Sequence, residues 1–237
     1  MISILMPLYN GIEFLDESIP SIINQTYTQW ELIIGINGHS NAAASDIIKK
    51  IKSFKDKRIK TVLCSSIGKS KTLNKLTWYA KYEYICVIDV DDKWVSSKLE
   101  KQLPLIKKYD VIGTDVEYFG NKSGTPGLFL GKLSKIMFSY QNPIINSAVM
   151  LRACDAWWDE EWEGLDDYNL WIELLKRKRT FYNVPEILVN HRLHNASFFN
   201  NKNDEMATKL KQEKVKKMSE KEYTDLGAIM DQKKWVL

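Results

Sequence analysis

The stretch that decides the fold is Tyr84-Ile85-Cys86-Val87-Ile88-Asp89-Val90-Asp91-Asp92. Its first five residues are apolar or aromatic, which is typical of a strand buried on both faces of a parallel sheet. Three carboxylates follow within four residues, and they need a counter-charge because they repel one another. A divalent cation supplies one through hard oxygen ligands. Taken alone, the same residues also fit a solvated acidic turn that caps the next helix.

Three apolar runs precede this stretch and alternate with helical patterns. They lie at residues 2–6, 31–36 and 59–64 and are expected to be strands. Strands that are apolar throughout and separated by helices predict an α/β fold, in which helices cover both faces of a parallel sheet. The helices are expected at residues 10–24, 43–54 and 69–81, the first of them opened by a capping box of Asn10 and Glu13.

Polar turns stand where three of these strands end. They are residues 7–10, Asn37-Gly38 and residues 89–92. In open parallel sheets, ligands bind at the carboxyl ends of the strands. The three turns are therefore expected on one rim of the sheet, and that rim is the predicted binding site.

The second half of the chain has a weaker pattern. Residues 98–108 are expected to be helical, with Pro104 kinking or shortening the helix. Further expected elements are a strand at 111–119, a loop or hairpin at 121–131, an apolar run at 144–151, a helix at 166–178 and a strand at 187–193.

Composition narrows the class of protein. The 34 basic and 30 acidic residues leave a net charge of +4, and much of that excess lies in residues 209–221, which favours a solvated helix face. Without a basic stripe interleaved with aromatics, nucleic acid is not an expected partner. Three widely spaced cysteines predict no disulfide framework and fit a reducing compartment. No signal peptide or membrane span is evident, so we expect a soluble, cytoplasmic protein, with peripheral membrane contact and oligomeric state left open.

Several segments, taken in order, resemble the large family 2 of glycosyltransferases. Residues 4–10 are similar to its opening strand and nucleotide-contacting turn, and residues 21–34 to its first helix and second strand. Residues 68–74 are similar to its Gly-rich entry to the third helix, and residues 89–102 to its metal motif and following helix. The resemblance implies the GT-A fold, which is a Rossmann-like, mostly parallel central sheet with helices on both faces.

The resemblance also implies roles at the rim. Pro7 and Tyr9 would shape the pocket for the base of a nucleoside-diphosphate sugar, with a UDP-sugar weakly favoured. Asp89 would contact the ribose and is a further candidate metal ligand. Asp91 would bind Mn²⁺ or Mg²⁺ on the diphosphate, supported from behind by Asp92. Sugar transfer needs such a metal because it neutralises the charge that develops on a leaving nucleoside diphosphate.

Two positions depart from the family pattern. Asn37 stands where the family usually has an Asp that contacts the base; its amide can both accept and donate, so the base preference stays open. Asn37 and Gly38 also fit a simple tight turn. Leu73 replaces the usual Arg, so a lysine is expected to supply the cation, with Lys71 preferred and Lys69 the alternative.

Asp166 and Asp167 form a second chemical site, at the start of an expected helix. They resemble the acidic pair of inverting family members, which implies that Asp167 is the catalytic base, with Asp166 as second choice. A helix N-terminus stabilises a carboxylate as the anion, and an ionised carboxylate can take the proton of an acceptor hydroxyl. Helix capping by both aspartates remains an alternative.

Arg192-Leu193-His194 resembles an Arg-x-His motif that faces the diphosphate in the family. Arg192 would contact phosphate, and His194 would contact phosphate or complete the metal shell. Residues two apart on a strand share a face, so the two can act together, although each also fits a surface position. Of Trp157, Trp158 and Trp162, at least two are expected in the core, and an acceptor platform is the other interpretation.

These observations predict a metal-dependent, inverting glycosyltransferase of glycan or polysaccharide synthesis, with a saccharide acceptor. We expect a single GT-A domain with a nucleotide-sugar-binding half at residues 1–92, an acceptor-binding half at 93–200 and a helical tail at 201–237. Two alternatives stay open. One is a catalytically silent nucleotide-sugar- or glycan-binding module. The other is a sugar nucleotidyltransferase, which usually has a Gly-rich loop with a basic residue where this chain has residues 7–10.

Overall fold

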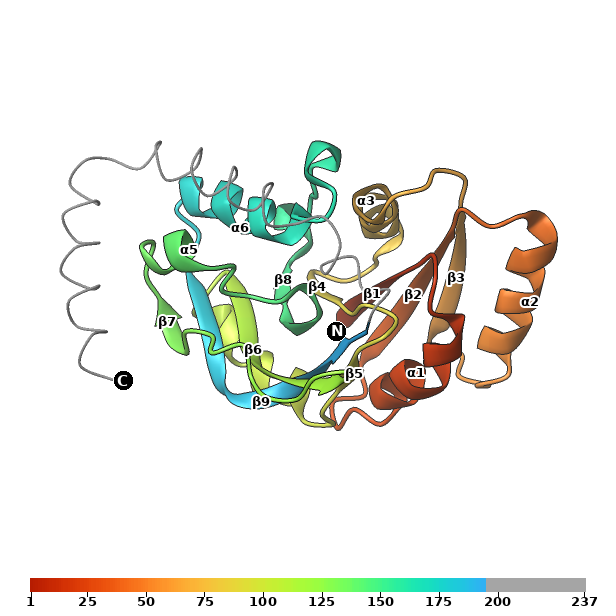
Figure 1. The fold of residues 1–237 in the computed structure, drawn as a ribbon, viewed down its shortest axis with the longest axis horizontal. Helices are drawn as coiled ribbons and strands as arrows, with labels where there is room; N and C mark the ends of the chain where they lie inside the picture. The colour runs from red at the N-terminus through yellow and green to blue at the C-terminus, as the bar shows by residue number, and fades with distance from the viewer. Residues whose placement is uncertain (195–237) are drawn as a thin grey trace.

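The computed structural model describes residues 1–194, and within that range one sheet of nine strands runs through the protein (Figure 1). Its order is β3-β2-β1-β4-β8-β6-β9-β5, and β7 pairs with β9. β1, β2, β3, β4, β6 and β9 run in one direction, whereas β5, β7 and β8 are antiparallel to their neighbours. The strands are β1 (Ile2–Leu8), β2 (Trp30–Asn37), β3 (Ile59–Cys64), β4 (Tyr84–Val87), β5 (Lys93–Trp94), β6 (Val111–Gly120), β7 (Gly131–Leu133), β8 (Met150–Arg152) and β9 (Phe181–Leu193). The predicted mostly parallel α/β sheet is confirmed.

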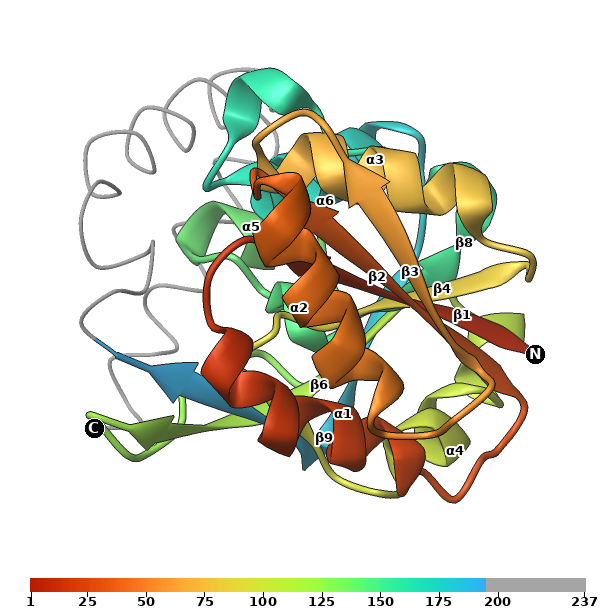
Figure 2. The same cartoon turned by 90° about the vertical axis from the view of Figure 1, so that its right-hand side faces the viewer.

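Helices cover both faces of this sheet (Figure 2). The α-helices are α1 (Leu15–Ile23), α2 (Asn41–Lys52), α3 (Lys69–Tyr79), α4 (Lys98–Gln102), α5 (Met137–Tyr140) and α6 (Asp166–Lys176). The side chains of α1, α2 and α4 join one hydrophobic cluster, and those of α3, α5 and α6 join the other. Two separate clusters, one on each face, explain why the central strands are apolar at most positions.

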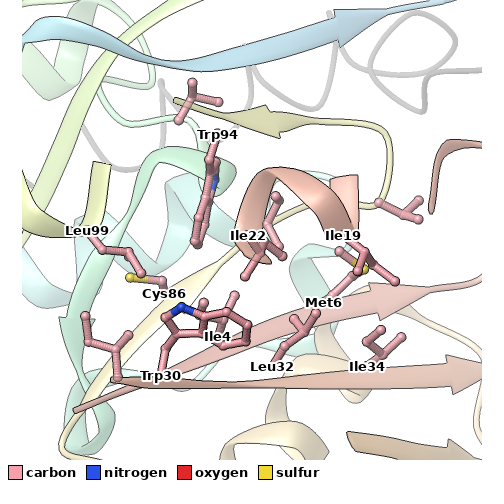
Figure 3. Packing of buried hydrophobic residues seen from close by; sticks show 14 of the residues in the cluster. Ile4, Met6, Ile19, Ile22, Trp30, Leu32, Ile34, Cys86, Trp94 and Leu99 are labelled. Atoms are coloured by element: carbon pink, nitrogen blue, oxygen red, sulfur yellow. The ribbon is translucent and has the colours of Figure 1, made fainter. Parts of the chain in front are cut away.

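Strand β1 contributes to both clusters. Ile4 and Met6 belong to the cluster under α1 (Figure 3), whereas Leu5 belongs to the cluster under α3. All three side chains are fully buried, and each such burial is worth about 1.5–3 kcal/mol. Because successive side chains of a strand point to opposite faces, an uninterrupted apolar run was the correct signal for a doubly covered strand.

Some predicted boundaries are wrong. The first helix was expected from Asn10 with a capping box, but the chain forms a 3₁₀ turn at Ile12–Phe14 and α1 begins at Leu15. The N-cap of that turn is Gly11 at φ 85°, a left-handed conformation that glycine adopts at low cost, and no side chain caps it. The shortening expected at Pro104 is confirmed: the helix that begins at Lys98 ends at Gln102, and a second 3₁₀ turn follows Pro104, which has no N–H to continue a helix.

Strand β9 is longer than predicted, since it begins at Phe181 and not near residue 187. The short strands β5 and β7 were not predicted, and the apolar run at 144–151 is a 3₁₀ turn followed by β8. The predicted tail at 201–237 lies outside the described residues. Across residues 1–194, no helix is both long and apolar enough to cross a bilayer.

Candidate active site

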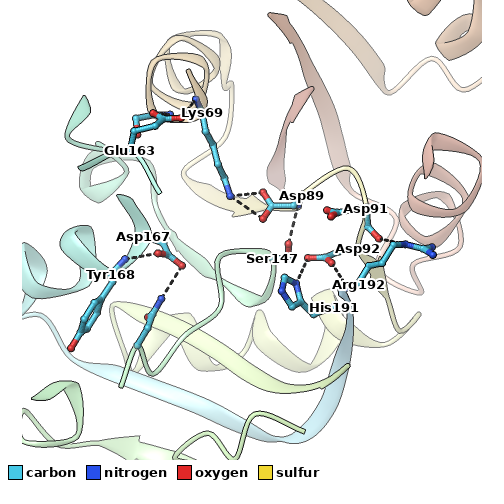
Figure 4. A network of polar contacts seen from close by, with 12 residues as sticks. Lys69, Asp89, Asp91, Asp92, Ser147, Glu163, Asp167, Tyr168, His191 and Arg192 are labelled. Carbon is cyan, nitrogen blue, oxygen red and sulfur yellow. Dashed lines mark hydrogen bonds and ion pairs between the residues drawn. The ribbon is translucent and has the colours of Figure 1, made fainter. Parts of the chain in front are cut away.

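The aspartate-rich turn lies after β4, at the carboxyl rim of the sheet, where the ends of β1 and β2 also lie. It is fixed from the second half of the chain. The Asp89 backbone N–H donates to Ser147 Oγ (2.9 Å), and the Trp94 indole N–H donates to the Ser147 carbonyl (2.8 Å). Segments that are far apart in sequence therefore set the conformation of this turn (Figure 4).

Asp92 anchors the turn to β9. Its side chain is fully buried and accepts from His191 Nδ1 (2.9 Å) and from the Arg192 backbone N–H (2.8 Å). Burial alone would raise the pKa of Asp92, but the charge and hydrogen bond of His191 outweigh it, so the pKa is lowered. Burial likewise opposes the His191 imidazolium, yet Asp92 raises its pKa to about 9. Asp92 and His191 thus form a buried ion pair, and Asp92 is a structural support.

Asp91 faces the solvent side of the same turn and contacts His194, with Oδ2 3.0 Å from Nε2. Burial, followed by the charges of Asp92 and Asp89, raises the pKa of Asp91 to about 6. Arg192 holds the backbone of the turn, because its Nε donates to the Asp91 carbonyl (3.0 Å). Negative charge is therefore crowded at this turn.

The Arg192 guanidinium is already engaged within the protein. It lies between the rings of Phe14 and Phe119, 4.5 and 4.3 Å from their centroids, and pairs with Glu17 at 2.7 Å. The sequence analysis expected Arg192 to contact phosphate. In this structure its contacts are those of a residue that braces the aspartate turn.

Lys69 is the lysine that reaches the aspartate turn. Its Nζ donates to Asp89 Oδ2 at 2.9 Å, whereas the Nζ of Lys71 lies 3.9 Å from Glu160 on the outer side of α3. Burial disfavours the Lys69 ammonium, but the charges of Asp89 and then Asp166 outweigh it and raise the pKa of Lys69. The residue preferred on sequence grounds, Lys71, is thus two positions away from the one that contacts Asp89.

Asp166 and Asp167 open α6. Figure 4 shows Asp167 on the other side of Lys69 from Asp89. Asp167 Oδ2 accepts from Asn142 Nδ2 (3.0 Å). Its Oδ1 accepts from the backbone N–H of Tyr168 (2.6 Å). Burial raises the pKa of both aspartates, to about 7 for Asp166, while the charge of Lys69 works against the rise. Asp166 Oδ2 is buried without a hydrogen-bond partner among residues 1–194.

The ends of β1 and β2 form the expected base-binding side. Pro7 is part of β1, and Tyr9, which follows it, is 46% exposed. Asn37 is buried, with Nδ2 donating to the Leu8 carbonyl (3.0 Å) and Oδ1 unpaired within the described residues. Gly38 has φ 71°, and a Cβ there would lie 2.5 Å from Tyr9 Cε2. Asn37 and Gly38 thus form a tight turn, and the same turn also places the polar side chain of Asn37 at the rim.

The three tryptophans before the acidic pair have different environments. Trp158 is fully buried, Trp162 packs partly against the same core, and Trp157 is 56% exposed. The backbone of Trp158 both donates to and accepts from the Asn74 side chain, at 2.8 and 2.7 Å. Trp158 and Asn74 thus join the acceptor side to α3.

Sequence reasoning gave no role to His191, Asn142 or Glu163. Glu163 accepts hydrogen bonds from the backbone N–H groups of Lys69 and Ser70, at the start of α3. The one available signal was for His191, because a carboxylate directly after a buried strand needs a cationic or hydrogen-bonding partner. Asn142 and Glu163 carried no comparable signal.

The residues present fit a hard divalent cation. Within residues 1–194 no three His, Cys, Asp or Glu side chains converge to form a complete metal cage. Mg²⁺-type sites, however, usually take one or two carboxylates and fill the remaining positions with water and substrate phosphate. Asp89 and Asp91 are the two carboxylates of the turn that would provide such a partial set, and His194 contacts Asp91.

A Rossmann-like, mostly parallel sheet with an aspartate turn on its carboxyl rim fits the GT-A fold expected from the sequence. Residues 3–158 match the sequence model described as Glycosyl transferase family 2, and the chain belongs to this family.

Known proteins agree with this assignment. The O-antigen biosynthesis glycosyltransferase WbnJ of Escherichia coli is 30% identical over 83% of this chain and 81% of its own length. WfgD of the same species is described as a UDP-Glc:alpha-D-GlcNAc-diphosphoundecaprenol beta-1,3-glucosyltransferase. It is 27% identical over 87% of this chain and 82% of its own length. The structure of S. aureus TarS 1–349 with UDP-GlcNAc superposes with a TM-score of 0.70 at 14% identity, covering 85% of this chain and 61% of TarS 1–349. The last comparison supports the fold.

Proposed function

We propose that this glycosyltransferase moves a sugar from a nucleoside-diphosphate donor to a saccharide hydroxyl, with inversion at the anomeric carbon and with a divalent metal. The observation that carries the proposal is the presence of two acidic sites around Lys69. Asp89 belongs to the turn after β4, and Asp167 opens α6. A leaving diphosphate needs positive charge, and an attacking hydroxyl needs a base. The aspartate turn would meet the first need by holding a metal cation, and Asp167 would meet the second as the base.

Support for the donor comes from the ends of β1 and β2. The exposed ring of Tyr9 offers a packing surface, and the unpaired Asn37 Oδ1 offers an acceptor. Because Nδ2 is already bonded to the Leu8 carbonyl, Asn37 is set to accept from a base N–H, which uracil possesses. WfgD is described as using UDP-Glc and TarS was solved with UDP-GlcNAc, so a uridine donor is the first to test.

Asp91, Asp89 and His194 would hold Mn²⁺ or Mg²⁺. When bound, the metal supplies positive charge that stabilises the departing diphosphate. Asp92 and His191 keep the turn in place and are not proposed as ligands, since each already serves the other. Lys69 adds a fixed positive charge beside Asp89.

Asp167 is the proposed base. The acceptor oxygen attacks the anomeric carbon from the face opposite the diphosphate and passes its proton to the Asp167 carboxylate. The bond from the anomeric carbon to the diphosphate oxygen breaks, and its electron pair leaves with the nucleoside diphosphate. One direct displacement inverts the configuration. Asn142 holds Asp167 Oδ2 and so orients the carboxylate.

The proposed acceptor is a saccharide of glycan or polysaccharide synthesis. WbnJ is described as an O-antigen enzyme, and the acceptor in the description of WfgD is a sugar on a lipid diphosphate. We propose an acceptor of the same lipid-diphosphate-linked class. The three cysteines are free thiols, which fits a reducing, cytoplasmic setting for the reaction.

The test begins with thermal unfolding in the presence of UDP- and GDP-sugars, with and without Mn²⁺, because a ligand that binds the folded state raises its stability. The nucleotide sugar that gives a metal-dependent shift is then used in a transfer assay. D91N and D167N should each abolish transfer while their melting temperatures without ligand stay near that of the wild type. Full transfer by either variant would refute the role of that residue.

The same assay separates the enzyme from a catalytically silent module. A silent module would bind the donor but release no nucleoside diphosphate, with or without acceptor. Membership in a glycosyltransferase family argues against a nucleotidyltransferase, which would form pyrophosphate from a nucleoside triphosphate and a sugar phosphate. Absence of that pyrophosphate completes the distinction.

A further inference from the structure

Glu163 joins the acceptor-side segment to the first turn of α3. One carboxylate oxygen accepts from the Lys69 backbone N–H, and the other accepts from the Ser70 N–H at 3.1 Å. Lys69 and Ser70 are the first two residues of this eleven-residue helix. A single side chain thus satisfies two of the N–H groups that a helix leaves unpaired at its start.

Helix α3 has no cap of its own. The residue before it is Gly68, which has no side-chain acceptor, and its φ of 134° lies outside the usual range of L residues. A Cβ at Gly68 would sit 3.5 Å from Glu163 Oε2, so the backbone and this carboxylate are in direct contact. A negative charge at a helix N-terminus is stabilising, and hydrogen bonds to an ionised acceptor are the stronger kind. The cap therefore comes from a residue more than ninety positions away.

Both ends of this contact lead to the reacting groups. The Lys69 side chain continues from the capped backbone to Asp89, at 2.9 Å (Figure 4). Glu163 stands shortly before Asp166 and Asp167 in the chain, joined to them by Gly164 and Leu165. The charge of Lys69 lies close enough to affect the pKa of both aspartates.

We propose that Glu163 is a positioning residue that fixes the donor-side aspartate turn relative to the catalytic base. Its role is to hold the start of α3 in place, and the catalytic base remains Asp167. The proposal rests on the transfer reaction described above. Without Glu163, the first turn of α3 loses its contact with the segment leading to α6, although Asn74 still joins α3 to Trp158. Both reacting sites then persist at a less productive spacing.

The test compares E163A and E163Q with E161Q, a matched change at an exposed glutamate on the same segment. We expect kcat to fall by about 10- to 100-fold in E163A, because a misplacement on the order of 1 Å costs about that much. The KM for the donor should change by less than about threefold, since the groups that bind it remain. E163Q keeps an oxygen that accepts an N–H, so it should restore part of kcat, and E161Q should match the wild type.

A second measurement follows the contact itself. Hydrogen exchange at the Lys69 and Ser70 amides should be faster in E163A and unchanged in E161Q. Faster exchange with an unchanged kcat would reduce Glu163 to a helix cap and overturn the proposal. So would a fall in kcat that only parallels a lower melting temperature and weaker donor binding. If the wild type transfers no sugar, the proposed reaction fails and the positioning role fails with it, whereas the exchange data still report the cap.

Discussion

Lys98 is a buried cation with no carboxylate partner within residues 1–194, and this makes the stability of the protein depend on pH in a definite direction. Its Nζ donates to Gln102 Oε1 (2.8 Å) and lies 3.9 Å from the centre of the Trp94 ring. Burial lowers its pKa from 10.5 to about 8, only partly opposed by the neighbouring Cys86. The folded protein therefore releases this proton at a lower pH than the unfolded chain does.

The sign follows from proton linkage. Between the two pKa values, the unfolded state binds more protons than the folded state, so stability increases as pH rises. A folded pKa of about 8 and an unfolded pKa of 10.5 imply a gain of about 2 kcal/mol between about pH 7 and about pH 9.5. Cys86 acts in the opposite direction at the upper end of this range, because burial raises the pKa of its thiol from 9 to about 11 and the unfolded thiol ionises first. A comparison with a variant that keeps Cys86 isolates the contribution of Lys98.

The assay is urea unfolding of the wild type and of K98M at several pH values across that range. Methionine keeps the length of the side chain and has no titrating group. K98M leaves Gln102 Oε1 without its donor, which costs about 1–3 kcal/mol, but this cost is the same at every pH. The prediction therefore concerns the difference in unfolding free energy between the two proteins, which should shift by about 2 kcal/mol in favour of the wild type.

K101M is the control, because Lys101 lies on the same helix with its ammonium near solvent and paired with Glu186 (3.1 Å). The difference in unfolding free energy between K101M and the wild type should not change with pH over this range. If the difference in unfolding free energy between K98M and the wild type is also independent of pH, Lys98 has an ordinary pKa and the reasoning from burial is refuted.

Three further outcomes are expected. G38A should lower stability by about 1 kcal/mol and weaken nucleotide binding, because the new Cβ strains a φ of 71° and meets the Tyr9 ring; urea unfolding and calorimetric titration with UDP and Mn²⁺ measure the two effects. D92N should destabilise the protein by about 3–5 kcal/mol at neutral pH, since it leaves His191 without its buried partner, and near-wild-type stability in urea would contradict the ion pair. Adding EDTA should abolish the thermal shift given by a nucleotide sugar and leave the melting temperature of the unliganded protein unchanged, whereas a shift that survives EDTA would argue against a bridging metal.

The central strands and the rim could be predicted from the sequence because they depend on local pattern and on topology. The largely apolar runs of β1, β2 and β4 identify doubly covered strands, and a parallel sheet then brings the following turns to one edge. The placement of Asp89 and Asp91 on that rim follows from these two steps. The start of α1 could not be predicted in the same way, since the left-handed Gly11 that precedes it is set by its packing against Val90 and Phe14.

The choice between Lys69 and Lys71 shows where local pattern stops being sufficient. Both lysines lie in the first turn of α3, and a helix turns by about 100° per residue, so two positions separate an inward side chain from an outward one. The phase of the helix decides which of the two reaches Asp89. The contact of Glu163 with the backbone of Lys69 and Ser70, made by a residue in the other half of the chain, holds this first turn in place.

The same dependence holds for the other contacts that complete the site. Asp92 pairs with His191, and the Asn74 side chain bonds to the backbone of Trp158. Each contact joins residues more than eighty positions apart, so each forms only after the sheet has brought the two halves together. Donor-side and acceptor-side groups are thus held in register by buried polar contacts between the halves. A substitution at one of these contacts is therefore expected to disturb both sites together, although it touches neither substrate.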